Sequence, residues 1–207
     1  MNGSRRRGPG RPRATPGPST EQRILASARE VFSEQGYERA TIQEIAERAG
    51  LSRPAVNHYF SGKEALYHVV FESTRDRVVA ESIADAAESE VLSARFSTFL
   101  HAAAKVDSSD RSFARFIASS LLDAFRHPEL RERATDQLEE IRSFISQALR
   151  TAVDRGEVRP DLDVPATAEM LLAVMWGMGL YAGFIGSHDQ LESVVDQFTR
   201  LIDGTLW

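Results

Sequence analysis

The fold is decided by the stretch TIQEIAERAGLSRPAVNHYF at residues 41–60, which predicts two short helices joined by a tight turn. Thr41 suits an N-cap, and Glu44 three residues later would complete a capping box. Gly50 favours the left-handed backbone that ends a helix, and Ser52 can cap the next one. A helix, a turn with glycine and a second helix make up the helix-turn-helix plan, whose second helix enters the DNA major groove.

The second helix of this stretch has two kinds of side chain. One set is small or apolar and can pack back on its own domain: Leu51, Ala55, Val56, Tyr59 and Phe60. The other set can form hydrogen bonds outward: Ser52, Arg53, Asn57 and His58. Such a helix favours DNA binding, although a solvated surface helix can carry the same groups, and helix-turn-helix geometry also occurs in proteins that do not bind DNA.

The residues after Phe60 predict a further helix, with Ser61 and Glu64 as a second capping box. With them, the sequence resembles the TetR family of bacterial transcriptional regulators over residues 20–70. The resemblance rests on Phe32…Gly36-Tyr37, Thr41-Ile42…Ile45-Ala46…Ala49-Gly50, Ser52, His58-Tyr59-Phe60 and Lys63-Glu64-Ala65-Leu66. It departs from the family at Asn57, where an aromatic residue is usual.

The resemblance implies an all-α fold with two functional parts. An N-terminal three-helix helix-turn-helix DNA-binding domain is expected at residues 20–66, and a C-terminal helical domain for effector binding and dimerisation at residues 67–207. Helical periodicity supports this, with helices expected near 20–36, 63–87, 91–105, 110–126, 135–155, 166–185 and 188–202. A further helix start is expected at Pro128, and no strand pattern is present.

Composition narrows the class of protein. The chain has 207 residues, of which 42% are hydrophobic and 27% charged, as in an ordinary globular protein. It has no cysteine, which excludes disulfides and thiol catalysis and fits a reducing cytoplasm. We expect no membrane partner, because no apolar run reaches the length of a membrane span. The net charge of −5 combines a basic arm with an acidic body.

The basic arm is residues 1–19, rich in Arg, Gly and Pro, and its composition predicts disorder in the free protein. Its segment Pro9-Gly10-Arg11-Pro12-Arg13 resembles the core of an AT-hook. Arg11 and Arg13 are therefore candidate minor-groove contacts, since a narrow A·T groove attracts arginine. The alternatives are a solvated basic tail and a cloning or start-site artefact.

Residue types on the helix-turn-helix suggest individual DNA contacts. Arg53 and Asn57 are candidates for base edges, guanine and adenine respectively. The candidate phosphate contacts are Thr41, Ser52, His58, Tyr59 and Lys63. Ala55 completes the predicted DNA-binding set, and the expected partner is a palindromic double-stranded operator read by a homodimer.

Residues 166–185 are apolar on nearly all sides, which predicts burial against a second subunit. Its glycines would allow close approach of another backbone, and the resemblance implies an antiparallel four-helix contact with residues 135–155. The predicted interface residues are Leu138, Ile141, Ile145, Leu149, Gly179 and Gly183. The alternative is a central core helix without an interface role.

Aromatic and methionine residues in the second domain could line a pocket, as the resemblance implies. The predicted ligand-binding residues are Phe96, Phe99, Phe113, Phe116, Leu121, Phe125, Met175, Trp176 and Tyr181. Side chains of these types at helical spacing are also ordinary core. Few charges share these faces, so we expect a small, mostly apolar effector, with His101, Arg115 and Asp123 as possible polar anchors.

No enzyme motif competes with this interpretation. The five histidines lack zinc-ligand spacing, there is no P-loop, and residues 177–183 only approach a dinucleotide fingerprint. We expect no catalytic residues, cofactor or metal. The sequence thus predicts a DNA-binding transcriptional regulator, a repressor released from its operator by a small effector. The alternative is a dimeric architectural protein that needs no effector.

Overall fold

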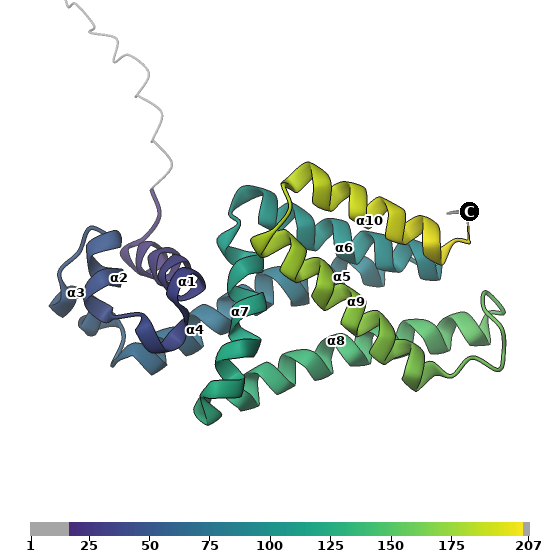
Figure 1. The fold of residues 1–207 in the computed structure, drawn as a ribbon, viewed down its shortest axis with the longest axis horizontal. Helices are drawn as coiled ribbons and strands as arrows, with labels where there is room; N and C mark the ends of the chain where they lie inside the picture. The colour runs from purple at the N-terminus through teal and green to yellow at the C-terminus, as the bar shows by residue number, and fades with distance from the viewer. Residues whose placement is uncertain (1–16, 205–207) are drawn as a thin grey trace, which may run out of the picture.

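The computed structural model describes residues 17–204, except the side chains of residues 107 and 109. Within this part of the chain every regular element is helical and there is no strand (Figure 1). The elements are α1 (Thr20–Arg39), α2 (Ile42–Arg48), α3 (Arg53–Tyr59), α4 (Lys63–Arg75), η1 (Asp76–Ala80), α5 (Glu81–Ala87), α6 (Leu92–Ser109), α7 (Ser112–Arg126), α8 (Pro128–Asp154), α9 (Val164–Phe184) and α10 (His188–Ile202). The all-α prediction is confirmed.

Helices α1 to α3 and the first half of α4 form the N-terminal unit (Figure 1). Its core contains Phe32, Ile45 and Val56, none of which is accessible to solvent. Phe116 of α7 and Leu130 of α8 belong to the same cluster. The body therefore completes the core of the N-terminal unit, so the division expected between residues 66 and 67 crosses a continuous helix and a shared core.

The first helix begins and breaks where the sequence predicts. Ser19 and Gln22 form a reciprocal capping box, with distances of 2.8 and 3.2 Å. Gly36 interrupts the helix with φ of 76° and ψ of 170°, a conformation that residues with a side chain rarely adopt. One further turn, residues 37–39, follows the break.

Two of the predicted capping boxes differ from the structure. Thr41 Oγ1 accepts the Glu44 N–H at 3.2 Å, but the Glu44 carboxylate points to Gln35 and Arg48 instead of back to the cap. The box predicted at Ser61 is wrong, because Gly62 is the N-cap of α4 and no side chain caps that helix.

The long helix predicted over residues 63–87 exists, with a feature that the sequence did not reveal. Its middle turn, η1, is π-helical and accommodates one extra residue between α4 and α5. Thus α4, η1 and α5 run continuously from the N-terminal unit into the body.

The body consists of α5 to α10, with α7 standing between the N-terminal unit and the remaining helices (Figure 1). α8 is longer than predicted and begins at Pro128, in its first turn. It ends in a Schellman turn at Gly156 (φ 71°), where Glu157 N–H donates to Ala152 O at 2.9 Å.

α9 is long and apolar enough to cross a membrane by length and composition, which corrects the expectation that no run reaches that length. It is nevertheless packed among α7, α8 and α10. Only 22% of its most apolar window is buried within the subunit, so much of its apolar surface remains uncovered.

Candidate DNA-binding surface and effector cavity

The turn before α3 is fixed by backbone hydrogen bonds. Gly50 (φ 66°) lets its own N–H reach Glu47 O at 3.0 Å and the Leu51 N–H reach Ala46 O at 2.8 Å, the two bonds of a Schellman motif. Arg23 of α1 donates to Ala49 O at 2.5 Å and secures the same turn from outside. The direction of α3 is therefore set by α1 and α2.

α3 presents its predicted polar face to solvent. Val56 is fully buried and Ala55 half-buried, whereas Arg53, Asn57 and His58 are exposed. Ser52 Oγ accepts the Ala55 N–H at 3.3 Å as the N-cap, and Thr41 and Tyr59 are also exposed. Their contacts with DNA remain predictions, while their accessibility permits those contacts. The arm residues Arg11 and Arg13 lie outside the described residues.

Lys63 has a role within the protein that the sequence did not indicate. Its Nζ donates to the carbonyls of Tyr37 and Glu38, at 2.8 and 3.0 Å, and lies 4.6 Å from the centre of the Tyr37 ring. The ammonium thus neutralises the carbonyl end of α1. Lysine has three N–H donors, so one remains for the predicted phosphate contact.

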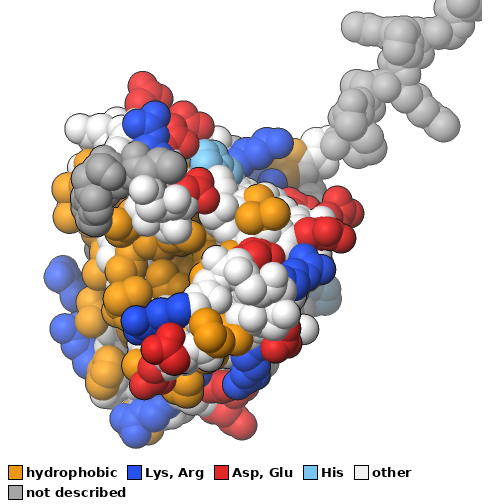
Figure 2. All heavy atoms as spheres, turned by 90° about the vertical axis from the view of Figure 1, so that its right-hand side faces the viewer, with side chains coloured by type: hydrophobic (Ala, Val, Ile, Leu, Met, Phe, Trp, Pro, Cys, Tyr) orange, Lys and Arg blue, Asp and Glu red, His pale blue; other side chains and the backbone are white. Residues whose placement is uncertain are grey.

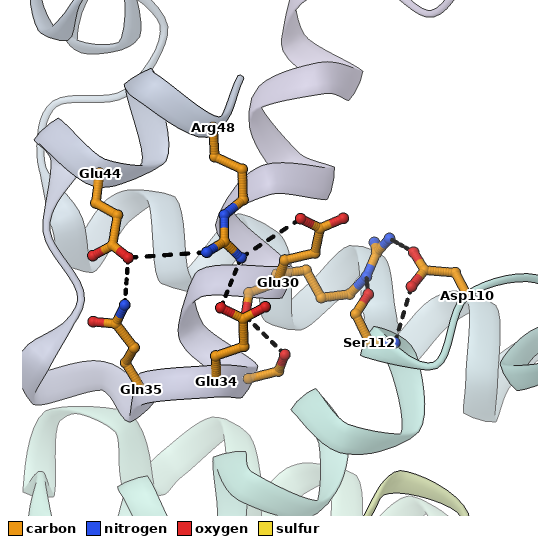
Figure 3. A network of polar contacts seen from close by, with 9 residues as sticks. Glu30, Glu34, Gln35, Glu44, Arg48, Asp110 and Ser112 are labelled. Carbon is orange, nitrogen blue, oxygen red and sulfur yellow. Dashed lines mark hydrogen bonds and ion pairs between the residues drawn. The ribbon is translucent and has the colours of Figure 1, made fainter. Parts of the chain in front are cut away.

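A network of charges attaches α2 to α1 (Figure 3). The Arg48 guanidinium lies 2.8 Å from Glu34, 3.6 Å from Glu30 and 4.0 Å from Glu44. Single surface pairs contribute little, but three carboxylates around one guanidinium form a network. This network holds the helix-turn-helix against the longest helix of its domain.

The N-terminal unit meets the body around Tyr37. Gly36 breaks α1, and at this break the Asp123 carboxylate of α7 accepts the Tyr37 N–H at 3.1 Å. Tyr67 of α4 donates its hydroxyl to the same oxygen at 3.2 Å. Burial raises the pKa of Asp123, while these hydrogen bonds oppose the rise. A second link joins Arg29 of α1 to Asp110, at 2.6 Å (Figure 3).

The body contains a cavity of about 110 Å³. It is lined by Val78, Val79, Phe99, Leu100, Ala103, Ala104, Ala114, Ile117, Gln137, Ile141, Leu172, Met175, Trp176, Met178, Gly179, Ala182, Leu191 and Val195. None of these side chains carries a charge. Figure 2 shows hydrophobic side chains gathered in a hollow on the end of the body opposite α3. An exposed apolar surface of this kind is typical of a ligand-binding groove or of a surface that a partner subunit covers.

Three predicted ligand-binding residues line the cavity: Phe99, Met175 and Trp176. The other six do not. Phe116 is in the core of the N-terminal unit, Phe113 lies under the Arg29 guanidinium at 3.5 Å, and Phe125 is 75% exposed. Of the remaining three, Phe96 is buried in the core of the body, and Leu121 and Tyr181 are half-buried.

The cavity residues that the sequence did not single out include Val78 and Val79 on η1 and Gln137 on α8. The extra residue of η1 has no sequence signature. Gln137 could have been noticed as a polar residue beside the apolar stripe of α8. Of the possible polar anchors, His101 is half-exposed near Asp196, Arg115 donates to Gly183 O, and Asp123 is at the Tyr37 junction.

The predicted dimer residues mostly face inward. Ile141, Ile145 and Leu149 are buried in the subunit core, and Leu138 packs against it. Gly183 packs on α7, because a Cβ there would lie 2.8 Å from Arg115 Cα. These positions therefore pack within the subunit, and their part in a dimer interface stays a prediction. Gly179 is half-buried at the cavity.

The apolar face of α9 that remains uncovered does not contain the predicted interface residues. It carries apolar side chains at helical spacing that are exposed in the subunit: Met170, Val174, Leu180 and Phe184. Gly177 lies on the same face, with no atom within 4 Å of a Cβ built on it. α8 lies beside this face and is tied to α9 by Arg142 and Glu169, at 2.6 Å.

Comparison with known proteins identifies this architecture. The family described as "Bacterial regulatory proteins, tetR family" matches residues 24–70, which include the whole helix-turn-helix. The family described as "Tetracyclin repressor-like, C-terminal domain" matches residues 98–198. The chain belongs to the TetR family. These two matches confirm the resemblance seen in the sequence. Regulators of this family bind DNA and form dimers.

The chain is similar to several named transcriptional regulators. UidR of Escherichia coli, an HTH-type transcriptional regulator, is 25% identical over 161 residues, 77% of this chain and 79% of its own. The repressor AcnR of Corynebacterium glutamicum is 27% identical over 188 residues, 91% and 93% of the two chains. The structure of Bacillus subtilis FadR in complex with stearoyl-CoA has a TM-score of 0.70 at 20% identity, covering 89% and 98%.

Nothing in the described part of this TetR chain indicates metal chemistry. Among residues 17–204, no group of three or more histidine, aspartate or glutamate side chains is placed to hold a metal ion. The accessible polar face of α3 and the cavity in the body are the candidate functional sites of this chain.

Proposed function

We propose that this TetR regulator is a repressor that leaves its operator when a small, mostly apolar effector enters the cavity of the body. The observation that carries the proposal is the path of one continuous helix. Val78 and Val79 of η1 line the cavity, and the same helix continues as α4 into the N-terminal unit. A ligand in contact with η1 thus acts on the helix that packs on α1, which with α2 sets the direction of α3.

The mechanism follows from how α4 is held. Leu66, Tyr67 and Val70 are buried against α1, so movement of α4 moves the whole N-terminal unit as one rigid piece. Two α3 helices read successive major grooves only at one separation. An effector that binds better to the subunit with displaced α4 lowers operator affinity by its differential affinity for the two states.

The dimer in this proposal uses the uncovered face of α9, with α8 beside it. Met170, Val174 and Phe184 supply apolar contacts, and the Arg142–Glu169 pair lies at the edge of the same surface. A two-fold dimer of this kind presents two copies of α3 to a palindromic operator. The proposed place of action is the cytoplasm, where the DNA is.

The proposed base readers are Arg53 and Asn57, which α3 holds exposed. Selection of bound sequences from a random DNA pool, with wild-type protein and Asn57→Ala, tests this assignment. We expect a palindromic site in which N57A loses discrimination at one position per half-site, by roughly 1–3 kcal/mol per base pair. An unchanged preference for N57A, or selection of sites without two-fold symmetry, contradicts the proposal.

The basic arm is included in the same selection. A protein lacking residues 1–13 should lose a preference for A·T pairs beside the half-sites if Arg11 and Arg13 bind the minor groove. Replacing Arg11 and Arg13 together by lysine is the matched control, because it keeps the charge and removes the flat guanidinium groups. The same flanking preference with and without the arm would remove this part of the proposal.

The alternative, an architectural protein without an effector, is separated by a ligand screen. A compound that enters the cavity raises the melting temperature and, if the repressor proposal holds, releases operator DNA. A compound that stabilises the protein without changing its DNA affinity favours the alternative.

A further inference from the structure

We infer that the five arginines of the basic arm supply most of the attraction between this protein and the phosphates of DNA, whatever the base sequence. The reason is the charge of the folded N-terminal unit. Residues 17–66 contain six lysines and arginines against seven glutamates, a net charge of −1, and residues 67–207 carry −9. The inference rests on the proposed DNA binding and names the group that the arm binds.

Most cations of the N-terminal unit are already engaged within the protein. Arg29 pairs with Asp110 at 2.6 Å, and its side chain is only 9% exposed. Arg48 lies among three glutamates, each within 4.0 Å of its guanidinium. Arg23 and Lys63 donate to backbone carbonyls. These contacts hold the unit together and reduce the charge that it presents to DNA.

Few cations of the unit therefore remain for phosphate. Within the described part of the chain, Arg39 and Arg53 are exposed and their side chains have no hydrogen-bond or ion-pair partner. Lys63 keeps one N–H beyond its two carbonyl contacts. Each phosphate neutralised by a cation contributes about 0.9 to the slope of log affinity against log salt. Three such contacts give a slope of about 2.7 per subunit, whereas five from the arm give about 4.5.

The arm joins the folded unit beside the reading helix. α1 begins at Thr20, and Arg23 in its first turn donates to Ala49 O, in the turn before α3, at 2.5 Å. The start of α1 thus lies one arginine side chain away from the turn that precedes α3. The chain between Arg13 and Ser19 spans up to about 20 Å. The arginines of the arm are therefore within reach of the phosphates that flank α3.

The salt dependence of DNA binding tests the inference in the dimeric protein. Fluorescence anisotropy gives the affinity for the selected operator and for a scrambled duplex of equal length, from about 50 to 300 mM KCl. We compare wild type with a protein lacking residues 1–13, and with two full-length variants. In these variants the five arginines are replaced together, by alanine in one and by lysine in the other, at Arg5, Arg6, Arg7, Arg11 and Arg13.

The expected result is the same on both duplexes. The slope falls by half or more in the truncated protein and in the alanine variant, by up to about 4.5 per subunit. The lysine variant is the matched control and keeps the wild-type slope, because it keeps the charge. The melting temperature stays unchanged in all four proteins, since the Ser19–Gln22 capping box that begins α1 is retained.

Three outcomes overturn the inference. One is a slope that falls by less than half without the arm, which would mean that the folded unit supplies the attraction. Another is tighter DNA binding by the truncated protein, which would place the arm against the acidic body of its own chain. The third is a lysine arm that behaves like the alanine arm, since charge alone would then not explain the attraction.

The test is independent of the repressor mechanism and of base reading. The slope on the scrambled duplex measures the arm even if the protein selects no operator or keeps its DNA when a ligand binds. Those two failures contradict the proposed function and leave this inference standing. A lysine arm that keeps the slope and loses the flanking A·T preference assigns affinity to charge and minor-groove reading to the guanidinium groups.

Discussion

The carboxylate of Asp123 on α7 accepts the backbone N–H of Tyr37, 3.1 Å away, at the break in α1. This bond joins the body to the N-terminal unit at the break that Gly36 makes in α1. A Cβ at Gly36 would lie 3.2 Å from Asp123 Oδ1, so the glycine also makes room for the carboxylate. The strength of this junction can be tested by mutation.

Asp123→Ala should lower the free energy of unfolding by roughly 2–4 kcal/mol. The change leaves the Tyr37 N–H and the Tyr67 O–H without their acceptor, and Asp123 itself is 5% exposed. Urea unfolding at a fixed protein concentration measures the effect. Asp136→Ala, at an exposed position on α8, is the control and should stay within about 0.5 kcal/mol of wild type. A similar small change for D123A would mean that the junction is held by packing alone.

The pH dependence of stability reports on the same carboxyl group. Burial raises the pKa of Asp123 above its usual value of 3.8, so the folded protein holds this proton more tightly than the unfolded chain. Its stabilising contribution is therefore complete below about pH 3.8 and is lost as the pH rises through the folded pKa. Relative to Asp123→Asn, wild type should gain stability as the pH falls from about 7 to 4.5. A relative loss over that range would contradict the raised pKa.

Lys63→Ala should affect both stability and DNA binding. It removes the ammonium from the carbonyls of Tyr37 and Glu38, which we expect to cost about 1–2 kcal/mol. If the remaining donor contacts phosphate, affinity falls for all sequences alike and the salt slope decreases by about one. Lys105→Ala on α6, exposed and far from α3 in the fold, is the control. Reduced stability with an unchanged slope would assign Lys63 to the fold alone.

Two glycines on α9 should respond in opposite directions. Gly183→Ala places a Cβ 2.8 Å from the Arg115 backbone, so we expect a loss of roughly 1–3 kcal/mol as α7 and α9 are pushed apart. Gly177→Ala meets no atom in the subunit and should stabilise the helix by up to about 1 kcal/mol. Sedimentation adds a second readout. Weaker dimerisation of G177A would show that a partner backbone approaches this face, whereas an unchanged dimer would place the contact elsewhere.

Much of the fold could be predicted because the signals are local. Thr41 and Ser52 cap their helices, Gly50 and Gly156 end theirs, and α10 has the predicted bounds. Each of these depends on a few neighbouring residues, which periodicity and capping chemistry describe well. The exposed face of α3 was predictable for the same reason.

The orientation of the body helices could not be predicted, because a stripe of apolar residues does not say what covers it. The stripe of α8 that includes Ile145 packs in the subunit core, although a partner could equally have covered it. α9 is apolar on all sides, so its sequence has no period that separates its inner face from its outer face. Phe116 lies in the N-terminal core through a contact between distant segments, which no local pattern encodes.

The π turn at residues 76–80 has a geometric consequence for how the subunit presents α3. Each residue of a regular helix advances the chain by about 100° around the axis, so one surplus residue offsets everything before it relative to everything after it. Val79 lines the cavity and Leu66 lies in the N-terminal core. The rotation about the helix axis from one of these side chains to the other includes this offset. The angle at which the N-terminal unit leaves the body thus depends on the residue count of a single turn, and deleting one residue there would rotate that unit against the contacts that Phe116 and Asp123 make with it.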